Sequence, residues 1–265
     1  MSAQALKNYT IAGTPSTNQL LRAYLEETRC EALRLVRNPG LAFPVLIMPV
    51  ALYALFALLI AGEAIDKDPG IGVFMFSAFS VMGISMPALF GLSSSLAMER
   101  EMGLMRLKRA QPAPTGSWLV AKIVCGVVFG ALALLPMIVL ATATGKLALD
   151  GAAITRMSLT LIACSIPFCA LGLMMGSLVK GSAAPGYANL VYLPGCYLSG
   201  MFFPLPQSMH WQRPIWPQFH VNQLAMHAAG VEKFQFEPVF MAGAGALGFT
   251  VLFSAVAIWR LAQKG

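Results

Sequence analysis

The stretch Met98–Pro112, MEREMGLMRLKRAQP, decides how the rest of this chain is interpreted, because it is a charged segment between two long apolar ones. Ile71–Ala97 precedes it and Trp118–Ala141 follows it, with Lys122 as the one charged residue inside these two apolar segments. An apolar run of about 20 residues is long enough to cross a bilayer as a helix. The charged stretch therefore lies at or beyond a membrane face and not in a protein core.

The composition of the 265 residues also indicates a membrane protein. Hydrophobic residues make up 57% and charged residues 11%, whereas soluble domains contain roughly a quarter charged residues. A net charge of +7 on a soluble surface would favour nucleic acid as a partner, but here the basic residues flank apolar segments, so membrane topology explains them better. The five cysteines are scattered and form no CxxC pattern, so neither a disulfide framework nor a metal site is predicted.

The pattern predicts an all-α integral membrane fold with six transmembrane helices, preceded by an amphipathic interfacial helix at Asn18–Asn38. We expect residues 1–40 to form a cytoplasmic tail and this helix, residues 41–260 a single transmembrane domain, and residues 261–265 a second cytoplasmic tail. The six predicted spans are Leu41–Gly62, Ile71–Ala97, Trp118–Ala141, Ala153–Val179, Ala183–Phe203 and Pro238–Trp259.

The basic residues predict the orientation. If the amino terminus is inside, thirteen of the 18 Lys and Arg residues fall on the inner side. Because loops rich in Lys and Arg stay cytoplasmic, this asymmetry places both termini in the cytoplasm. The five basic residues left on the outer side are Lys67, Lys146, Arg156, Arg213 and Lys233.

The segment between the fifth and sixth spans, residues 200–237, allows two interpretations. It begins apolar and broken by proline, continues with Trp and His residues, and then has a plausible helix at Asn222–Ala229. It is either a re-entrant piece of the membrane domain or an ordinary outer loop with an amphipathic covering helix. We favour the re-entrant piece, because Met201–Phe203 is apolar and runs directly into two prolines.

Several motifs that would supply energy or catalysis do not occur. The sequence has no GxxxxGK[ST] phosphate-binding loop and no charged or His residue in the middle of a predicted span. Proton coupling is therefore poorly supported, although sodium coupling through carbonyls and hydroxyls stays open. Two GxxxG patterns, at Gly126–Gly130 and Gly172–Gly176, fit packing within the chain as well as dimerisation.

Four local matches together resemble the permease subunit of an ABC transporter of the ABC-2 (type V exporter) class. The more specific ones are Arg100-Glu101-x-Gly103 with Leu107 and Pro112, and Ser199-Gly200-Met201-Phe202-Phe203-Pro204 followed by Pro217-Gln218-Phe219-His220. The weaker ones are Arg37-Asn38-Pro39 before the first span and Lys122 at the entry to the third. One departure is Leu104, where the family often has Thr.

The resemblance implies a coupling helix at residues 99–110 that docks into a separate ATPase subunit, with Asn18–Asn38 as the connecting helix. It implies that the chain itself has no catalytic residue, metal or cofactor, and that ATP and Mg²⁺ bind to the partner. The implied partners are that ATPase, a second and usually identical permease chain, and the lipids of a bacterial-type inner membrane, with no nucleic acid. The implied ATPase-coupling residues are Glu99, Arg100, Glu101, Gly103, Leu104, Leu107 and Arg37.

The resemblance also implies a translocation path along the dimer axis and an outer gate in residues 200–229. Methionine and aromatic side chains suit hydrophobic or amphipathic cargo, such as a drug, a lipid or a lipid-linked glycan, although the same side chains also suit lipid contact or helix packing. The path candidates are Phe79, Met82, Met86, Tyr192 and Tyr197, and the gate candidates are Phe202, Phe203, Pro204, Phe219 and His220.

Two other functions remain open from the sequence. One is a secondary carrier or channel that works without ATP, and the other is a membrane scaffold for signalling or assembly. A co-purifying ATPase would favour the ABC exporter, and transport by the isolated chain down an ion gradient would favour the carrier.

Overall fold

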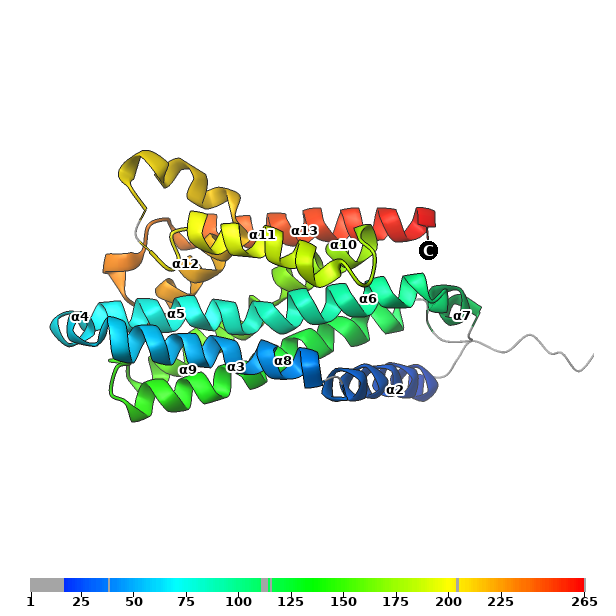
Figure 1. Cartoon of the computed structure of the whole chain (residues 1–265), viewed down its shortest axis with the longest axis horizontal. Helices are drawn as coiled ribbons and strands as arrows, with labels where there is room; N and C mark the ends of the chain where they lie inside the picture. Colours follow the sequence, from blue (N-terminus) through cyan, green and yellow to red (C-terminus); the bar gives the residue numbers. More distant parts are fainter. Residues whose placement is uncertain (1–16, 38, 111–113, 115, 204, 265) are drawn as a thin grey trace, which may run out of the picture.

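The computed structural model describes residues 17–37, 39–110, 114, 116–203 and 205–264, and every regular element in these ranges is a helix. The helices form an elongated bundle (Figure 1), in which α5 and α6 run end to end along the long axis. The short helix α7 and the carboxyl-terminal end of α13 lie at one end of this bundle, and α4 lies at the other. An all-α membrane fold is therefore confirmed.

The amphipathic helix α2 spans Thr17–Val36, within two residues of the predicted Asn18–Asn38. It ends at Val36, shortly before Pro39, which is the first residue of the next helix, α3 (Pro39–Tyr53). Proline cannot continue a helix, but it suits the first turn of one. The π-helix η1, Ala54–Ile60, extends α3 without a break. Helix α2 packs along α8.

The centre of the bundle is one continuous helical segment, Pro69–Glu101. In the most apolar part of this segment, 89% of the residues are buried. Asp68 caps its start by accepting a hydrogen bond of 3.0 Å from the backbone N–H of Gly70. The segment contains a π-bulge at Pro87, which accommodates a residue that would otherwise break the helix. Its parts are α5 (Pro69–Met86), η2 (Pro87–Gly91) and α6 (Leu92–Glu101), and α4 (Gly62–Lys67) precedes it.

The turn after α6 separates the central segment from α7, Leu104–Ala110. Gly103 makes this turn with a φ of +71°, a left-handed conformation that glycine adopts without strain. The chain then returns along the bundle as α8, Ser117–Ala143.

The second half of the chain covers the central segment from the other side. Helix α10 packs on α6 and α13, and α12 packs on α13, α9 and α5. Of the residues of α12, most are buried, so this helix belongs to the bundle. The elements are α9 (Gly151–Ala163), α10 (Ile166–Leu178), α11 (Ala184–Leu198), η3 (Gln207–Ile215), α12 (Pro217–Ala229), η4 (Glu232–Phe234) and α13 (Val239–Lys264).

Within the described residues, four helical segments are long and apolar enough to cross a membrane, and they correspond to the predicted second, third, fourth and sixth spans. The first predicted span contains a shorter apolar segment, Val45–Ile60. The fifth is represented by α11, whose 15 residues reach only about 22 Å, less than the roughly 30 Å of a bilayer core. The six-span count and the re-entrant segment therefore stay predictions.

Both GxxxG patterns serve packing within the chain. A Cβ atom on Gly172 would lie 2.4 Å from the backbone oxygen of Ala88, and one on Gly176 would lie 2.8 Å from that of Ser93. Gly126 and Gly130 of α8 approach the same central segment from another direction. These glycines let α8 and α10 approach the backbone of the central helix closely.

Candidate functional site

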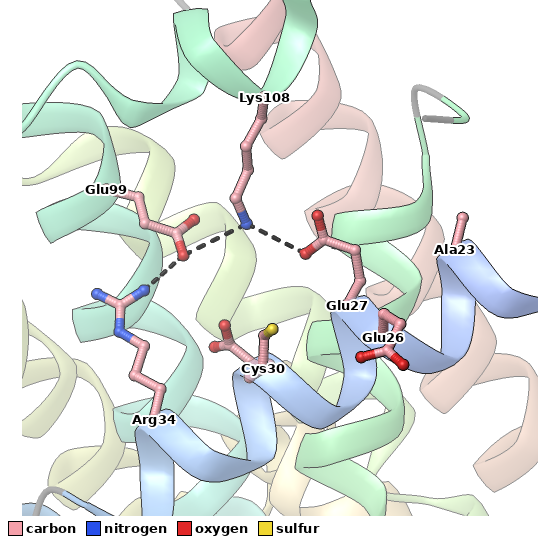
Figure 2. Close-up of a pocket in the computed structure, with 8 residues that line it drawn as sticks. Ala23, Glu26, Glu27, Cys30, Arg34, Glu99 and Lys108 are labelled. Carbon is pink, nitrogen blue, oxygen red and sulfur yellow. Dashed lines mark hydrogen bonds and ion pairs between the residues drawn. The ribbon is translucent and has the colours of Figure 1, made fainter. Parts of the chain in front are cut away.

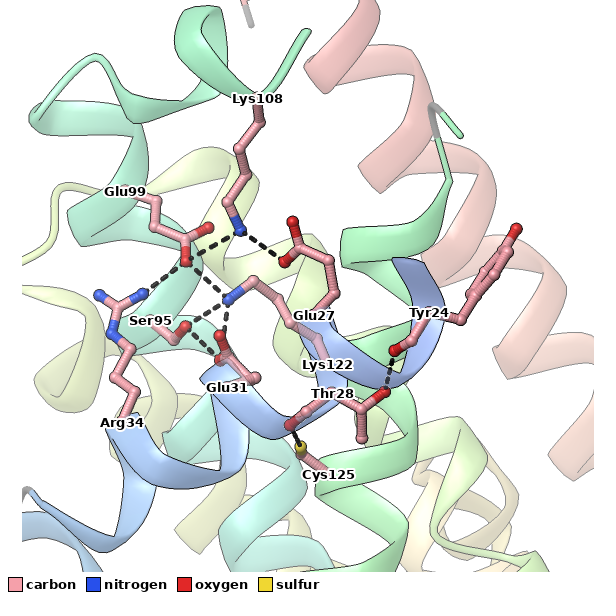
Figure 3. A network of polar contacts seen from close by, with 10 residues as sticks. All are labelled: Tyr24, Glu27, Thr28, Glu31, Arg34, Ser95, Glu99, Lys108, Lys122 and Cys125. Carbon is pink, nitrogen blue, oxygen red and sulfur yellow. Dashed lines mark hydrogen bonds and ion pairs between the residues drawn. The ribbon is translucent and has the colours of Figure 1, made fainter. Parts of the chain in front are cut away.

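Four helices contribute charged and polar side chains to one buried cluster at the α7 end of the bundle (Figure 3). On α2, acidic and basic residues spaced four and three apart share one face of the helix. On α6, Ser95 and Glu99 are likewise four residues apart, and the short helix α7 and the first turns of α8 each add a lysine. We call this set the charge network: Glu27, Glu31, Arg34, Ser95, Glu99, Lys108 and Lys122.

Lys122 is the centre of the charge network, and none of its surface is exposed. Its ammonium group donates to Glu31 Oε1 at 2.8 Å, to Glu99 Oε1 at 3.1 Å and to the hydroxyl of Ser95. Ser95 in turn donates to Glu31 Oε1 at 2.6 Å. An ammonium group has three N–H donors, so every donor of this buried charge has an acceptor.

Glu99 connects the buried part of the network to its rim. Its Oε1 atom lies 2.5 Å from an Arg34 nitrogen of α2 and 3.7 Å from the Lys108 ammonium of α7. Lys108 also lies 3.5 Å from Glu27, so this lysine bridges α2 and α6. The second oxygen of Glu99, Oε2, is buried and has no hydrogen-bond partner among the described residues.

The environment of Glu31 favours its charged form. Burial alone would raise the pKa of this carboxyl, but the positive charge of Lys122 and the hydrogen bonds from Lys122 and Ser95 outweigh burial. The pKa of Glu31 is therefore below its usual value. The ionised carboxylate is the form that holds α2 against α8.

A groove of about 460 Å³ opens over the charge network between α2 and the α6–α7 turn (Figure 2). The lining side chains carry four carboxylates and two cations, with the Lys122 charge directly behind them. A site with this excess of carboxylates, one of which has a free buried oxygen, can accept a hydrogen-bond donor or a cationic side chain. The lining residues are Ala23, Glu26, Glu27, Cys30, Glu31, Arg34, Glu99 and Lys108.

The predicted coupling residues lie at this end but face in different directions. Glu99 is buried in the charge network, and Arg100 donates to the backbone oxygen of Gly176 at 2.8 Å, at the end of α10. Leu104 is half-buried, whereas Leu107 is 62% exposed. The remaining three, Glu101, Gly103 and Arg37, are exposed.

Most of the predicted path residues meet in one apolar cavity of about 230 Å³ between α3, α5, α11 and the residues after α11. Phe79 and Met82 of α5 and Tyr197 of α11 line it. Phe202, predicted for the gate, stacks on Phe79 with ring centroids 5.1 Å apart. The lining residues are Met48, Leu52, Phe56, Met75, Ala78, Phe79, Met82, Leu193, Tyr197, Met201, Phe202 and Phe203.

The other two predicted path residues, Met86 and Tyr192, lie elsewhere. Met86 lines a neighbouring cavity of about 330 Å³, which shares Met48 and Leu193 with the first. Tyr192 is fully buried between α11 and α5, where its hydroxyl lies 2.5 Å from that of Ser85.

The predicted gate residues do not form one cluster. Phe202 and Phe203 line the apolar cavity, whereas Phe219 and His220 lie on α12, and the His220 ring packs against α13. Pro204 falls outside the described residues. Of the three predicted gate phenylalanines, Phe202 and Phe203 thus belong to the cavity wall and Phe219 does not.

Comparison with known families identifies the chain. The sequence profile of the ABC-2 type transporters matches residues 26–228, from within α2 to α12, and this match includes the charge network and the apolar cavity. This chain belongs to the ABC-2 type transporter family. None of the curated proteins matches it.

The protein is therefore a multi-pass membrane permease of an ABC-type transporter, which is a transport component. ABC-2 permeases normally work with an ATPase subunit. In this ABC-2 permease, the charge network lies between the amphipathic helix α2 and the membrane helices α6 and α8.

Of the charge network, only Glu99 was among the predicted site residues, and Lys122 was named only as a basic residue at the entry to the third span. The members not predicted as site residues are Glu27, Glu31, Arg34, Ser95 and Lys108. The available signal was the isolated lysine in an otherwise apolar span, because a charge in such a place requires a partner. The four-residue spacing of Glu27 and Glu31 on the amphipathic helix was the matching signal for that partner.

Proposed function

We propose that this ABC-2 permease is the membrane subunit of an ATP-driven exporter that moves hydrophobic or amphipathic cargo together with a separate ATPase subunit. The observation that carries the proposal is the charge network, which joins the short helix α7 to the amphipathic helix α2 and to the membrane helices α6 and α8. A permease without its own phosphate-binding loop needs such a connection to receive work from a partner.

In this proposal, α7 is the coupling helix and the ATPase binds its exposed side. Met105 of α7 is buried in the bundle, whereas Leu107 and the preceding Met102 are exposed and apolar. Leu107 and Met102, with the exposed Glu101, form a small contact surface, and the neighbouring groove offers carboxylates to a basic side chain of the ATPase.

Movement of α7 would change the network contacts directly. Lys108 lies between Glu27 and Glu99 at 3.5 and 3.7 Å, longer than the contacts of Lys122, so it can shift toward either carboxylate. Coupling requires contacts that differ between two states of the transporter. We infer that Lys108 exchanges partners as the ATPases close, while Lys122 keeps α2, α6 and α8 together as a stiff unit.

The proposed topology has six spans and both termini in the cytoplasm. Its support is the end-to-end arrangement of the bundle, in which the carboxyl-terminal end of α13 lies on the same side as the basic helix α7. In this topology α3 with η1 forms the first span, and α11 with the residues after it forms the fifth. The membrane is the inner membrane of a bacterial-type cell, and α12 with its flanking residues is the re-entrant segment.

The proposed translocation path includes the apolar cavity and is completed by a second copy of the chain. The cavity wall consists of methionine, aromatic and aliphatic side chains, which suit a drug, a lipid or a lipid-linked glycan. Exposed apolar residues on α11, among them Leu190 and Leu193, fit a position between two permease chains. ATP and Mg²⁺ bind to the ATPase in this scheme, and the permease chain binds no cofactor.

Reconstitution into lipid vesicles tests the proposal. We expect extrusion of a fluorescent hydrophobic dye only when the permease, the ATPase and Mg-ATP are all present. Vesicles with either subunit alone, or with both subunits and a non-hydrolysable ATP analogue, serve as controls and should retain the dye. Dye movement by the permease alone under a proton or sodium gradient would overturn the proposal.

One observation favours a second candidate, the ATP-independent carrier. Glu99 and Lys122 are buried ionisable residues at the ends of membrane-spanning helices, and such residues form ion relays in secondary transporters. The same vesicle experiment separates the two functions, because a carrier responds to an ionophore that collapses the gradient and the ATP-driven exporter does not.

A further inference from the structure

His220 makes a second buried ionisable cluster, at the end of the bundle away from α7. Its Nδ1 atom lies 2.7 Å from Glu237 Oε1, and its Nε2 atom lies 2.9 Å from the backbone oxygen of Pro214. The side chains of His220 and Glu237 are only 6% and 9% exposed. Both ring nitrogens therefore face oxygen atoms in a largely dry environment.

The chemistry of these partners fixes the number of protons in the cluster. The Pro214 carbonyl can only accept, so Nε2 carries a hydrogen and donates to it. Nδ1 and the Glu237 carboxyl then share one further proton, either as an imidazolium beside a carboxylate or as a neutral ring beside a carboxylic acid. Without that proton, the Nδ1 lone pair would face an ionised and buried carboxylate.

The shared proton connects three segments of the chain. Pro214 belongs to η3, His220 to α12, and Glu237 to the residues leading into α13. The ring also rests on the backbone of α13, since a Cβ atom on Gly245 would lie 2.5 Å from it.

Two other side chains of α12, Gln223 and His227, also contact the residues that lead into α13. Gln223 accepts from the backbone N–H of Phe236 at 2.6 Å and donates to the Phe234 carbonyl at 3.3 Å. The ring of His227 contacts the backbone oxygen of Glu237 at 2.7 Å. Among these side chains, only His220 hydrogen-bonds to a titratable side chain. Only that contact therefore changes from attractive to repulsive when a proton is lost.

We propose that the His220–Glu237 pair is a proton-operated latch, which holds η3, α12 and the start of α13 together while the shared proton is bound and releases the segment 231–238 when that proton is lost as the pH rises. The latch itself needs no transport activity, and only the placement of this end outside the cell rests on the proposed function.

The other charged groups near the His220–Glu237 pair contact other partners or lie far from it. The shared proton therefore determines whether the contact between His220 and Glu237 is attractive. From η3, the Arg213 guanidinium lies 4.8 Å from the centre of the Phe236 ring, and no bond from it to Glu237 is present. Lys233 in η4 pairs with Asp68 before α5, and Arg156 of α9 contacts the Ala228 backbone oxygen at 3.4 Å. On α13, the first charged residue is Arg260, 23 positions beyond Glu237 and at the opposite end of the bundle.

Hydrogen exchange of the full chain in lipid nanodiscs, without any ATPase, tests the latch. We expect that, between about pH 5.5 and pH 8.5, exchange corrected for its intrinsic pH dependence becomes about tenfold faster in the peptide containing Phe236, with peptides of α8 unchanged. A wild-type profile without a transition would overturn the proposal, whatever the transport assays show.

Two variants assign the transition. In Glu237→Gln, the carboxamide can donate to Nδ1 of a neutral ring, so the contact forms without the extra proton and exchange should not depend on pH. His227→Gln removes the neighbouring histidine and should keep the wild-type transition. A transition retained in Glu237→Gln, or lost in His227→Gln, would overturn the latch. If Glu237→Gln fails to fold, His227→Gln and the wild-type profile still decide the question.

Discussion

The charge network and the apolar cavity are stabilised in opposite ways. In the network, three donors of one lysine have three acceptors at defined positions, so each contact depends on one particular partner. In the cavity, methionine and aromatic side chains contribute non-directional contacts, and many substitutions of similar size fit. The network is therefore suited to transmit a defined movement, and the cavity to accept cargo of varied shape.

The largest expected effect comes from Lys122→Met, which removes the central cation of the network. The carboxylates of Glu31 and Glu99 would be left buried with too little positive charge, and we expect a loss of about 3–5 kcal/mol in the free energy of unfolding. Denaturant unfolding of the purified protein in detergent measures it. The matched control is Lys233→Met, because Lys233 is 65% exposed and an ion pair at such an exposed position contributes little to stability. Equal losses of unfolding free energy in the two variants would show that the charge network stabilises the protein no more than the exposed Lys233–Asp68 pair does.

A pH series sharpens the comparison, because it affects the network and leaves the uncharged cavity unchanged. The pKa of Glu31 is lower in the folded protein than its usual value of 4.5, so its stabilising contribution is present above that value. The contribution is lost as the pH falls through the folded-state pKa. We expect the melting temperatures of wild type and Glu31→Gln to differ at about pH 7 and to converge below pH 4.5. A constant gap down to about pH 3 would contradict the assignment.

Lys108→Ala should affect coupling more than stability. Lys108 lies at the rim of the network with a 20% exposed side chain, so we expect a stability loss of only about 1 kcal/mol. Its removal disconnects α7 from Glu27 and Glu99, and we expect the amount of cargo moved per ATP hydrolysed to fall several-fold. The measurement is the ratio of dye transport to phosphate release in vesicles, with Lys180→Ala as a control from the exposed turn after α10. A ratio unchanged in Lys108→Ala would remove this lysine from the coupling route.

The smallest effect on the protein itself is expected from Tyr197→Leu in the cavity. Tyr197 is half-exposed, so stability should change by less than about 1 kcal/mol and ATP hydrolysis should keep its coupling. The apparent affinity for aromatic cargo should fall about threefold to tenfold, because a ring contact is lost. Dose–response curves for an aromatic and an aliphatic dye measure it. An equal loss for both dyes would indicate a packing defect and not a cargo contact.

Much of this architecture can be predicted from the sequence, because the length of an apolar run and the position of a proline determine helix length and helix boundaries locally. The break at Pro39 occurs where the sequence predicts it, and four predicted spans have their counterparts. The turn at Gly103 was not predicted, and it divides the predicted coupling helix at residues 99–110 between the end of α6 and α7. The limits of the first and fifth spans could not be predicted as well, because hydropathy does not register the π-helix at Ala54–Ile60 or the end of α11 at Leu198.

The site was predicted only in part, because its contacts join residues far apart in the sequence. The motif around Arg100 drew attention to the α7 end of the bundle, but it could not show that Glu99 faces inward or that Arg100 binds the end of α10. Likewise, Lys122 was recognised as a basic residue at a span entry, whereas its pairing with Glu31 depends on the packing of α2 along α8. Pairings of this kind require the tertiary structure.

The central claim is that the partner ATPase contacts the protein at α7, next to the charge network. Photo-crosslinking in a co-expressed complex tests it most directly, with the crosslinking amino acid placed at Leu107 of α7 or at Trp211 of η3, which is 74% exposed at the other end of the bundle. We predict a crosslink to the ATPase from position 107 and none from position 211. A crosslink from position 211, or none from position 107 in a complex that hydrolyses ATP, would contradict the account.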